Sequence, residues 1–150
     1  MKKIALLTVL LLSAFVPQTA RTQPADVMET IHFLPLDIYI DSHQTPLAVY
    51  QFELTTLAGQ VEIVGVEGGE HPAFAHAPYY DPAALANDRI IIATYSTSDE
   101  LPVGTTRVAT LHLQITGGIE PEFVLELITA ADPDGRRTPA EIMYAQGETR

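Results

Sequence analysis

Apolar and polar side chains alternate along most of the chain after residue 30, and this two-residue period constrains the fold more than any other feature. In residues 36–41, for example, Leu, Ile and Ile occupy every second position, with Asp, Tyr and Asp between them. Successive side chains of a strand point to opposite faces, so this pattern is typical of a strand with one face in a core. The segments that carry the signal are residues 36–41, 48–54, 61–66, 89–96, 108–116, 122–128 and 140–144.

Turn-forming residues separate these segments and leave no room for long helices. Residues 42–46 and the Asp-Pro-Asp-Gly run at residues 132–135 are typical of turns. Asp81 followed by Pro82 predicts one short helical turn, with Asp81 as its N-cap. Short strands without the strand–helix–strand spacing of parallel sheets predict an all-β sandwich or jelly roll of about seven strands.

The N-terminal residues predict a signal peptide. Lys2 and Lys3 form a short basic start, and residues 4–16 form an apolar run of 13 residues. That run is shorter than the ~20 residues that a membrane-spanning helix needs, and Ala20 offers a small residue for cleavage. We therefore expect a secreted or periplasmic protein without a membrane span. The predicted organisation is a signal peptide at residues 1–20, a flexible leader at residues 21–30 and one domain at residues 31–150.

The charge of the chain is strongly negative. Its formal net charge is −11, and removal of residues 1–20 takes away two lysines and no acid, which leaves −13 and no lysine at all. Such a surface repels phosphate backbones, so nucleic acid is not an expected partner. The chain has no cysteine, which excludes disulfides, cysteine-bound zinc and thiol catalysis.

Two segments hold residue types that bind metals. Glu70, His71 and His76 lie close together in a proline-containing stretch, and a loop could bring them round a zinc or copper ion. An ordinary ordered loop explains them better, since their spacing matches no helix or strand. Residues 132–135 open like a calcium loop, but the distal glutamate is absent and a hairpin turn accounts for them. We predict neither metal ligands nor a cofactor.

Enzyme motifs are absent from the sequence. No serine has a Gly-x-Ser-x-Gly context, and Asp99-Glu100 fit a solvated turn better than a catalytic pair. His112 lies on the polar side of an alternating strand and is expected to be exposed. We therefore predict no catalytic residues.

Aromatic residues near the middle of the chain suggest a possible glycan contact. Tyr79 and Tyr80 are adjacent, and Phe74 lies near them. The chain has no tryptophan, so a flat stacking strip for crystalline polysaccharide is not expected. Tyr79 and Tyr80 either contact a soluble glycan or cover the edge of the core.

Several of the predicted strands resemble those of the cohesin domain family. The likeness spans roughly residues 36–145 with the order of elements preserved. It rests on strand hydrophobicity and a few small residues. The segments that carry it are residues 47–54 (LAVYQFEL), 61–66 (VEIVGV), 88–96 (DRIIIATYS) and 103–113 (VGTTRVATLHL). The resemblance implies a nine-stranded jelly roll, related to the carbohydrate-binding domain superfamily, that docks a protein partner on one flat sheet face. The expected fold is thus an all-β jelly-roll sandwich of about seven to nine strands.

Residues 89–96 are apolar on both sides, which one core alone does not require. The strand pattern of the family implies that Ile91, Ala93 and Tyr95 point inward. The predicted partner-binding residues on the docking face are Ile90, Ile92 and Thr94.

The expected function is a secreted, non-catalytic binding or assembly module that docks a dockerin-like or other secreted or envelope protein. A carbohydrate-binding module and a metal-dependent periplasmic enzyme subunit are the two alternatives.

Overall fold

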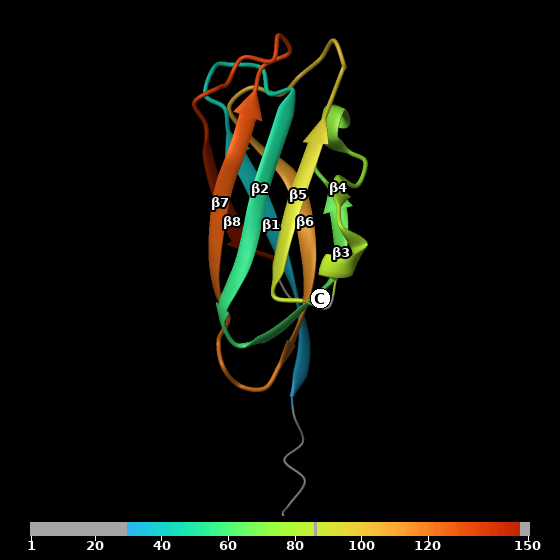
Figure 1. Ribbon diagram of the computed structural model, residues 1–150, viewed down its shortest axis with the longest axis vertical. Helices are drawn as coiled ribbons and strands as arrows, with labels where there is room; N and C mark the ends of the chain where they lie inside the picture. The colour runs from blue at the N-terminus through green and yellow to red at the C-terminus, as the bar shows by residue number, and fades with distance from the viewer. Residues whose placement is uncertain (1–29, 86, 148–150) are drawn as a thin grey trace, which may run out of the picture.

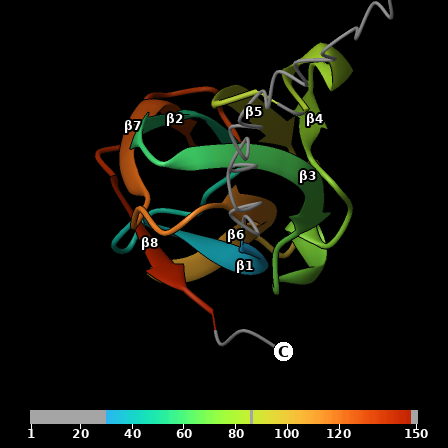
Figure 2. The same ribbon diagram turned by 90° about the horizontal axis from the view of Figure 1, so that it is seen from below.

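The computed structural model describes residues 30–85 and 87–147, which form two four-stranded antiparallel sheets packed face to face (Figures 1 and 2). The β1 sheet has the strand order β3–β6–β1–β8, and the β2 sheet has the order β4–β5–β2–β7. The elements are β1 (Ile31–Asp41), β2 (Val49–Ala58), β3 (Gln60–Gly68), η1 (Pro72–Phe74), β4 (Tyr79–Tyr80), η2 (Pro82–Ala84), β5 (Arg89–Tyr95), β6 (Thr105–Thr116), β7 (Glu122–Ala131) and β8 (Glu141–Gln146).

The chain crosses from one sheet to the other at every link except the one between β4 and β5. This winding confirms the predicted all-β sandwich and is that of a jelly roll. The predicted helical turn is also confirmed as η2, a 3₁₀ turn in which the Asp81 carboxylate accepts a hydrogen bond from the Ala83 N–H at 2.9 Å.

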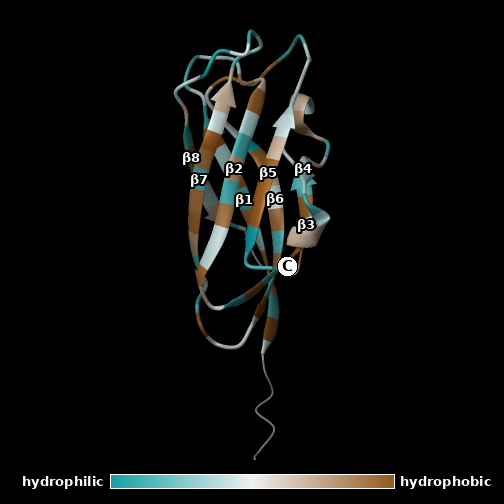
Figure 3. Cartoon of the chain, viewed as in Figure 1, coloured by the Kyte–Doolittle hydropathy of each residue, from teal (hydrophilic) through white to brown (hydrophobic). Residues whose placement is uncertain are grey.

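The core lies between the sheets and follows the two-residue period. Leu36, Ile38 and Ile40 of β1 are fully buried, and so are Phe52 and Leu54 of β2. The same alternation is visible as bands of hydropathy along the strands in Figure 3. The inward faces of two antiparallel sheets therefore supply most of the buried apolar surface.

A β-bulge interrupts the alternation in β6. Ile38 pairs with Ala109 and Tyr39 pairs with Arg107, so Val108 is an extra residue in the strand. Val108 and Ala109 are both fully buried, so the strict two-residue period predicted for residues 108–116 is wrong at this point. The bulge also leaves the Val108 carbonyl to accept a hydrogen bond of 2.9 Å from the buried Tyr50 hydroxyl.

The segment between β3 and β4 contributes to the core. It carries η1, whose Phe74 is buried and meets the Tyr50 ring edge-on at a centroid distance of 5.2 Å. Two glycines allow this segment to pack tightly on its neighbours. A Cβ at Gly68 would lie 2.3 Å from the carbonyl oxygen of Ala75, and a Cβ at Gly69 would lie 2.3 Å from the carbonyl oxygen of Arg107. This segment thus helps to close the side of the sandwich on which the edge strands β3 and β4 lie.

The predicted signal peptide at residues 1–20 and nearly all of the predicted leader lie outside the described residues. Within the part that is described, no helix is long and apolar enough to cross a membrane.

Candidate functional site

The two sides of β5 are the reverse of those predicted. Ile90 and Ile92 are 1% and 0% exposed and belong to the core, whereas Ile91 and Tyr95 are 38% and 63% exposed. Ile90, Ile92 and Thr94 therefore do not lie on an outer docking face, and the predicted partner-binding set is wrong in its orientation.

Pairing with β2 sets this orientation. Ile90 lies opposite Leu54 and Ile92 lies opposite Phe52, and directly paired residues point to the same side of a sheet. The three consecutive isoleucines do not indicate which side of the strand faces the core. The charged Arg89 does indicate it, because the residues on the same side of the strand as Arg89, such as Ile91, point outward.

An apolar patch covers part of the outer face of the β2 sheet. Tyr79 and Tyr95 are 67% and 63% exposed, and their rings lie nearly parallel at a centroid distance of 6.4 Å. Strand pairing places Tyr79 opposite Ala93 and Val49 opposite Tyr95, which joins three strands into one surface. We call this surface the tyrosine patch, and its residues are Val49, Tyr79, Ile91, Ala93 and Tyr95.

The adjacent tyrosines of β4 point to opposite sides. Tyr79 belongs to the patch, whereas Tyr80 lies opposite Ile92 and packs partly buried against the core. Of this pair, only Tyr79 can contact a ligand on the outer face, whereas Tyr80 covers the edge of the core. Sequence reasoning missed Tyr95 as its aromatic neighbour, because it assigned Tyr95 to the interior.

An ion pair borders the patch beside Ile91. The Arg89 guanidinium donates from Nε and Nη2 to the two carboxylate oxygens of Glu53 at 2.8 and 2.7 Å. The hydrogen bond from Arg89 lowers the pKa of Glu53, and the same bond raises the pKa of Arg89. Glu53 lies directly opposite Ile91 in the sheet, so this paired charge marks one boundary of the apolar surface.

A groove extends the patch at its other end, beside Tyr95. It has a volume of about 430 Å³, and Asp99 and Asp132 are the charged residues that line it. Asp81 lies in a further hollow beside Ile91 and Arg89. Apart from the paired Arg89, the charged residues that line these two hollows are therefore negative.

His71 and Glu70, two of the three residues of metal-binding type noted in the sequence, are engaged in local structure. His71 Nδ1 accepts a hydrogen bond from the Ala73 N–H at 3.2 Å and caps η1, while the Glu70 carboxylate accepts one from the Arg107 N–H at 3.0 Å. Among the described residues, no group of three or more His, Asp or Glu side chains is placed to hold a metal ion.

The Asp-Pro-Asp-Gly segment forms the predicted turn. The Asp132 carboxylate accepts hydrogen bonds from the N–H groups of Asp134 and Arg136 at 3.0 and 2.8 Å, and Gly135 has a φ of 77°. A left-handed backbone of this kind favours glycine. The residues that suggested a calcium loop thus serve the turn itself.

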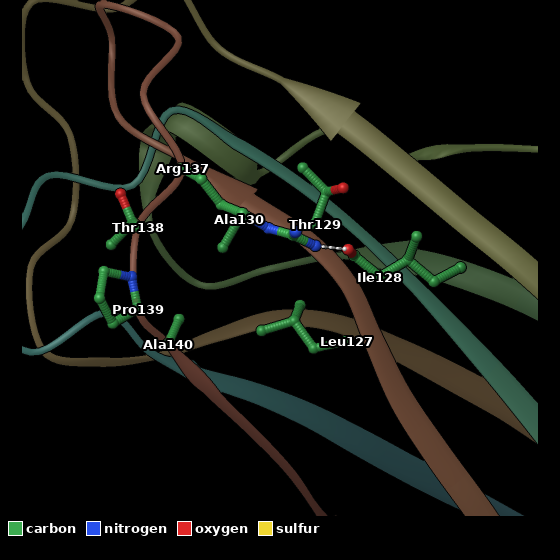
Figure 4. Close-up of a pocket in the computed structure, with 8 residues that line it drawn as sticks. All are labelled: Leu127, Ile128, Thr129, Ala130, Arg137, Thr138, Pro139 and Ala140. Carbon is green, nitrogen blue, oxygen red and sulfur yellow. Dashed lines mark hydrogen bonds between the residues drawn. The ribbon is translucent and has the colours of Figure 1, made fainter.

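A smaller pocket of about 320 Å³ lies at the edge of the sandwich between the end of β7 and residues 137–140 (Figure 4). Its Arg137 guanidinium donates to the Ile128 carbonyl at 2.6 Å, which occupies a backbone acceptor of the edge strand β7. Covering an edge in this way hinders unwanted strand pairing, so the arginine has a structural role here.

Comparisons of the chain with protein-family models, with curated proteins and with solved structures found no match.

Proposed function

We propose that this protein is an exported, non-catalytic binding module that docks a protein partner on the tyrosine patch. The observation that carries the proposal is a group of apolar side chains on three paired strands, in which Tyr79, Ile91 and Tyr95 are exposed and Val49 and Ala93 are half-buried. Groups of this kind mark interaction sites, and protein interfaces are enriched in tyrosine.

The composition of the patch favours a protein over a glycan. Ile91, Ala93 and Val49 add aliphatic surface beside the stacked tyrosines, and the one polar side chain paired with these residues apart from Glu53 at the border is that of Gln51, opposite Ala93. A glycan site needs polar groups that converge on hydroxyls, whereas an apolar centre with a charged rim is the usual anatomy of a protein interface. Since the unpaired charges around the patch are acidic, the partner has basic residues around an apolar centre.

The likeness of several strands to the cohesin family agrees with this proposal, since cohesins dock partners on one sheet face. We propose the same use for the β2 sheet, with Tyr79, Ile91 and Tyr95 in place of the residues predicted from the sequence.

The test is a pair of matched aromatic substitutions on opposite faces of the sandwich. The Tyr95→Ala variant should bind the partner at least about tenfold more weakly, because interface tyrosines contribute strongly to affinity. The control is Phe33→Ala, which removes an exposed ring from the outer face of the β1 sheet and should leave partner affinity unchanged. A photoreactive residue at position 91 should cross-link to that partner, and identical affinities for both variants would contradict the assignment.

Export is a separate part of the proposal. The basic start, the 13-residue apolar run and the small residue at Ala20 support cleavage near Arg21. N-terminal sequencing of the protein released from cells should therefore begin near Arg21. A cytosolic protein that retains Met1 would contradict export without affecting the docking assignment.

A further inference from the structure

The outer face of the β1 sheet holds a hollow of a different kind. It has a volume of about 600 Å³ and lies over β1, β6 and β3. Gly65 of β3 lies opposite His112, and even a Cβ at this position would make only ordinary contact with the imidazole ring, so the His112 side chain is not crowded from β3. We call this hollow the polar cleft, and the lining residues used below are Phe33, Asp37, Glu67, Arg107 and His112.

Two charged side chains of the polar cleft, those of Asp37 and Arg107, form an opposite pair. Thr110 Oγ1 donates to Asp37 Oδ1 at 2.5 Å and accepts from Arg107 Nη1 at 2.6 Å, which links a carboxylate to a guanidinium 3.8 Å away. Glu67 Oε1 lies 3.0 Å from His112 Nε2. All of these side chains except that of Glu67 are largely covered, and they stand on neighbouring paired strands.

An exposed aromatic ring stands at the edge of the same cleft. Phe33 is 57% exposed, and its partner across β6 is Gln114, which in turn lies opposite Glu62 of β3. The ring is therefore bordered by planar polar side chains and makes no contribution to the core. A face of the ring can cover an apolar surface of a ligand that lies in the cleft.

We propose that the polar cleft binds a neutral saccharide. A hydroxyl both donates and accepts, so a sugar can use carboxylates as acceptors and a guanidinium as donor in one site. Asp37 and Glu67 accept from sugar hydroxyls, Arg107 donates to them, and Phe33 packs against the apolar C–H face of the ring. The volume is within the range of small-molecule sites, and strand pairing holds the groups in place before the ligand arrives.

The pairing of charges selects against ionic ligands. An anion that approaches Arg107 also approaches Asp37, and a cation that approaches Asp37 also approaches Arg107, since the two groups lie 3.8 Å apart. A neutral ligand meets neither repulsion. This site lies on the sheet opposite the tyrosine patch, so it is independent of the proposed protein docking.

Saturation-transfer NMR of the full chain with cellobiose, maltose, lactose and chitobiose tests the proposal, with glucuronic acid and glucosamine as charged comparisons. We expect at least one neutral disaccharide to bind and both charged sugars to bind more weakly. Phe33→Ala should weaken binding about tenfold and Glu67→Gln about three- to tenfold. Both side chains are exposed, so the variants should keep the unfolding midpoint of the unmodified chain.

The control variant is Tyr95→Ala, which should bind the same disaccharide as tightly as the unmodified chain. Absence of binding by all four neutral disaccharides would overturn the proposal. So would tighter binding of a charged sugar, or binding that Tyr95→Ala abolishes and Phe33→Ala does not, which would move the glycan to the tyrosine patch.

Discussion

The two outer faces of the sandwich are built by the same alternation and differ in chemistry. On the β2 sheet, Tyr79, Ile91 and Tyr95 form an apolar surface with negative charges at its borders. On the β1 sheet, Asp37 and Arg107 are paired inside a hollow and a single aromatic ring stands beside them. Away from the β6 bulge the core uses about every second residue of the central strands, so the remaining positions are free to differ between the sheets. A fold of this class therefore does not specify what either face binds.

A charge placed on the inner or on the outer side of β5 should have very different effects on stability. Ile92→Asp puts a carboxylate in the core and should destabilise the fold by more than about 4 kcal/mol. Ile91→Asp places the same charge on the exposed side and should cost less than about 1 kcal/mol. Urea unfolding of both variants measures the difference, and equal losses would mean that β5 does not have one inner and one outer side.

Substitutions on the two sides of β6 test which residues of the β1 sheet support the core. Leu111 is fully buried, so Leu111→Ala should cost about 2–5 kcal/mol through lost contacts and a residual cavity. His112 points to the polar cleft, and His112→Ala should stay within roughly 0.5 kcal/mol. A large loss for His112→Ala would show that the imidazole supports the sheet as well as lining the cleft.

The sequence predicted the fold because most of the strands repeat one local signal, although the two-residue strand β4 was not among those predicted. Leu36, Ile38 and Ile40 alternate with polar residues, and no tertiary information is needed to assign their buried side. That signal fails where both sides of a strand are apolar, as at Ile91 and Ile92. Pairing with the neighbouring strand then decides which side faces the core.

The site was less predictable because its residues meet only through the topology. Tyr79 and Tyr95 are distant in sequence and become neighbours through the pairing of β4 with β5. Asp37 and Arg107 likewise meet through the pairing of β1 with β6, and the bulge at Val108 gave no sequence signal.

Tyrosines on the inside and the outside of the β2 sheet provide a third comparison. Tyr50→Phe leaves the buried Val108 carbonyl without its donor and should cost about 1–2 kcal/mol. Tyr95→Phe removes an exposed hydroxyl, and its unfolding free energy should change by less than about 0.5 kcal/mol. Guanidinium unfolding of both variants at neutral pH checks this difference, and a larger loss for Tyr95→Phe would contradict it.

Alkaline pH should reveal the same buried hydroxyl. Burial raises the pKa of Tyr50, so the folded chain keeps this proton at pH values where the unfolded chain loses it. The stabilisation is complete below the ordinary tyrosine pKa of about 10 and is lost as the pH rises above it. The unmodified chain should therefore lose more unfolding free energy than Tyr50→Phe between about pH 9 and pH 11. Parallel losses in the two proteins would show that Tyr50 does not resist ionisation.

The smallest expected effect concerns the ion pair at the border of the tyrosine patch. Arg89 lowers the pKa of Glu53, chiefly through the hydrogen bond between their side chains. A lowered carboxyl pKa favours the folded state above the ordinary value of about 4.3, and this benefit is lost as the pH falls through the folded value. Arg89→Ala should therefore move the midpoint for Glu53 upward in an NMR titration of its side-chain carbon.

Because the Arg89 side chain is mostly exposed, we expect no measurable change in the unfolding midpoint of Arg89→Ala at neutral pH. The matched control is Arg136→Ala, which removes an arginine from an exposed pair with Asp134 in the turn after β7 and should leave the titration of Glu53 unchanged. An unaltered Glu53 midpoint in Arg89→Ala would mean that the two side chains do not stay paired in solution. The apolar surface around Ile91 would then be bordered by a free carboxylate, which would make the patch still more selective for a basic partner.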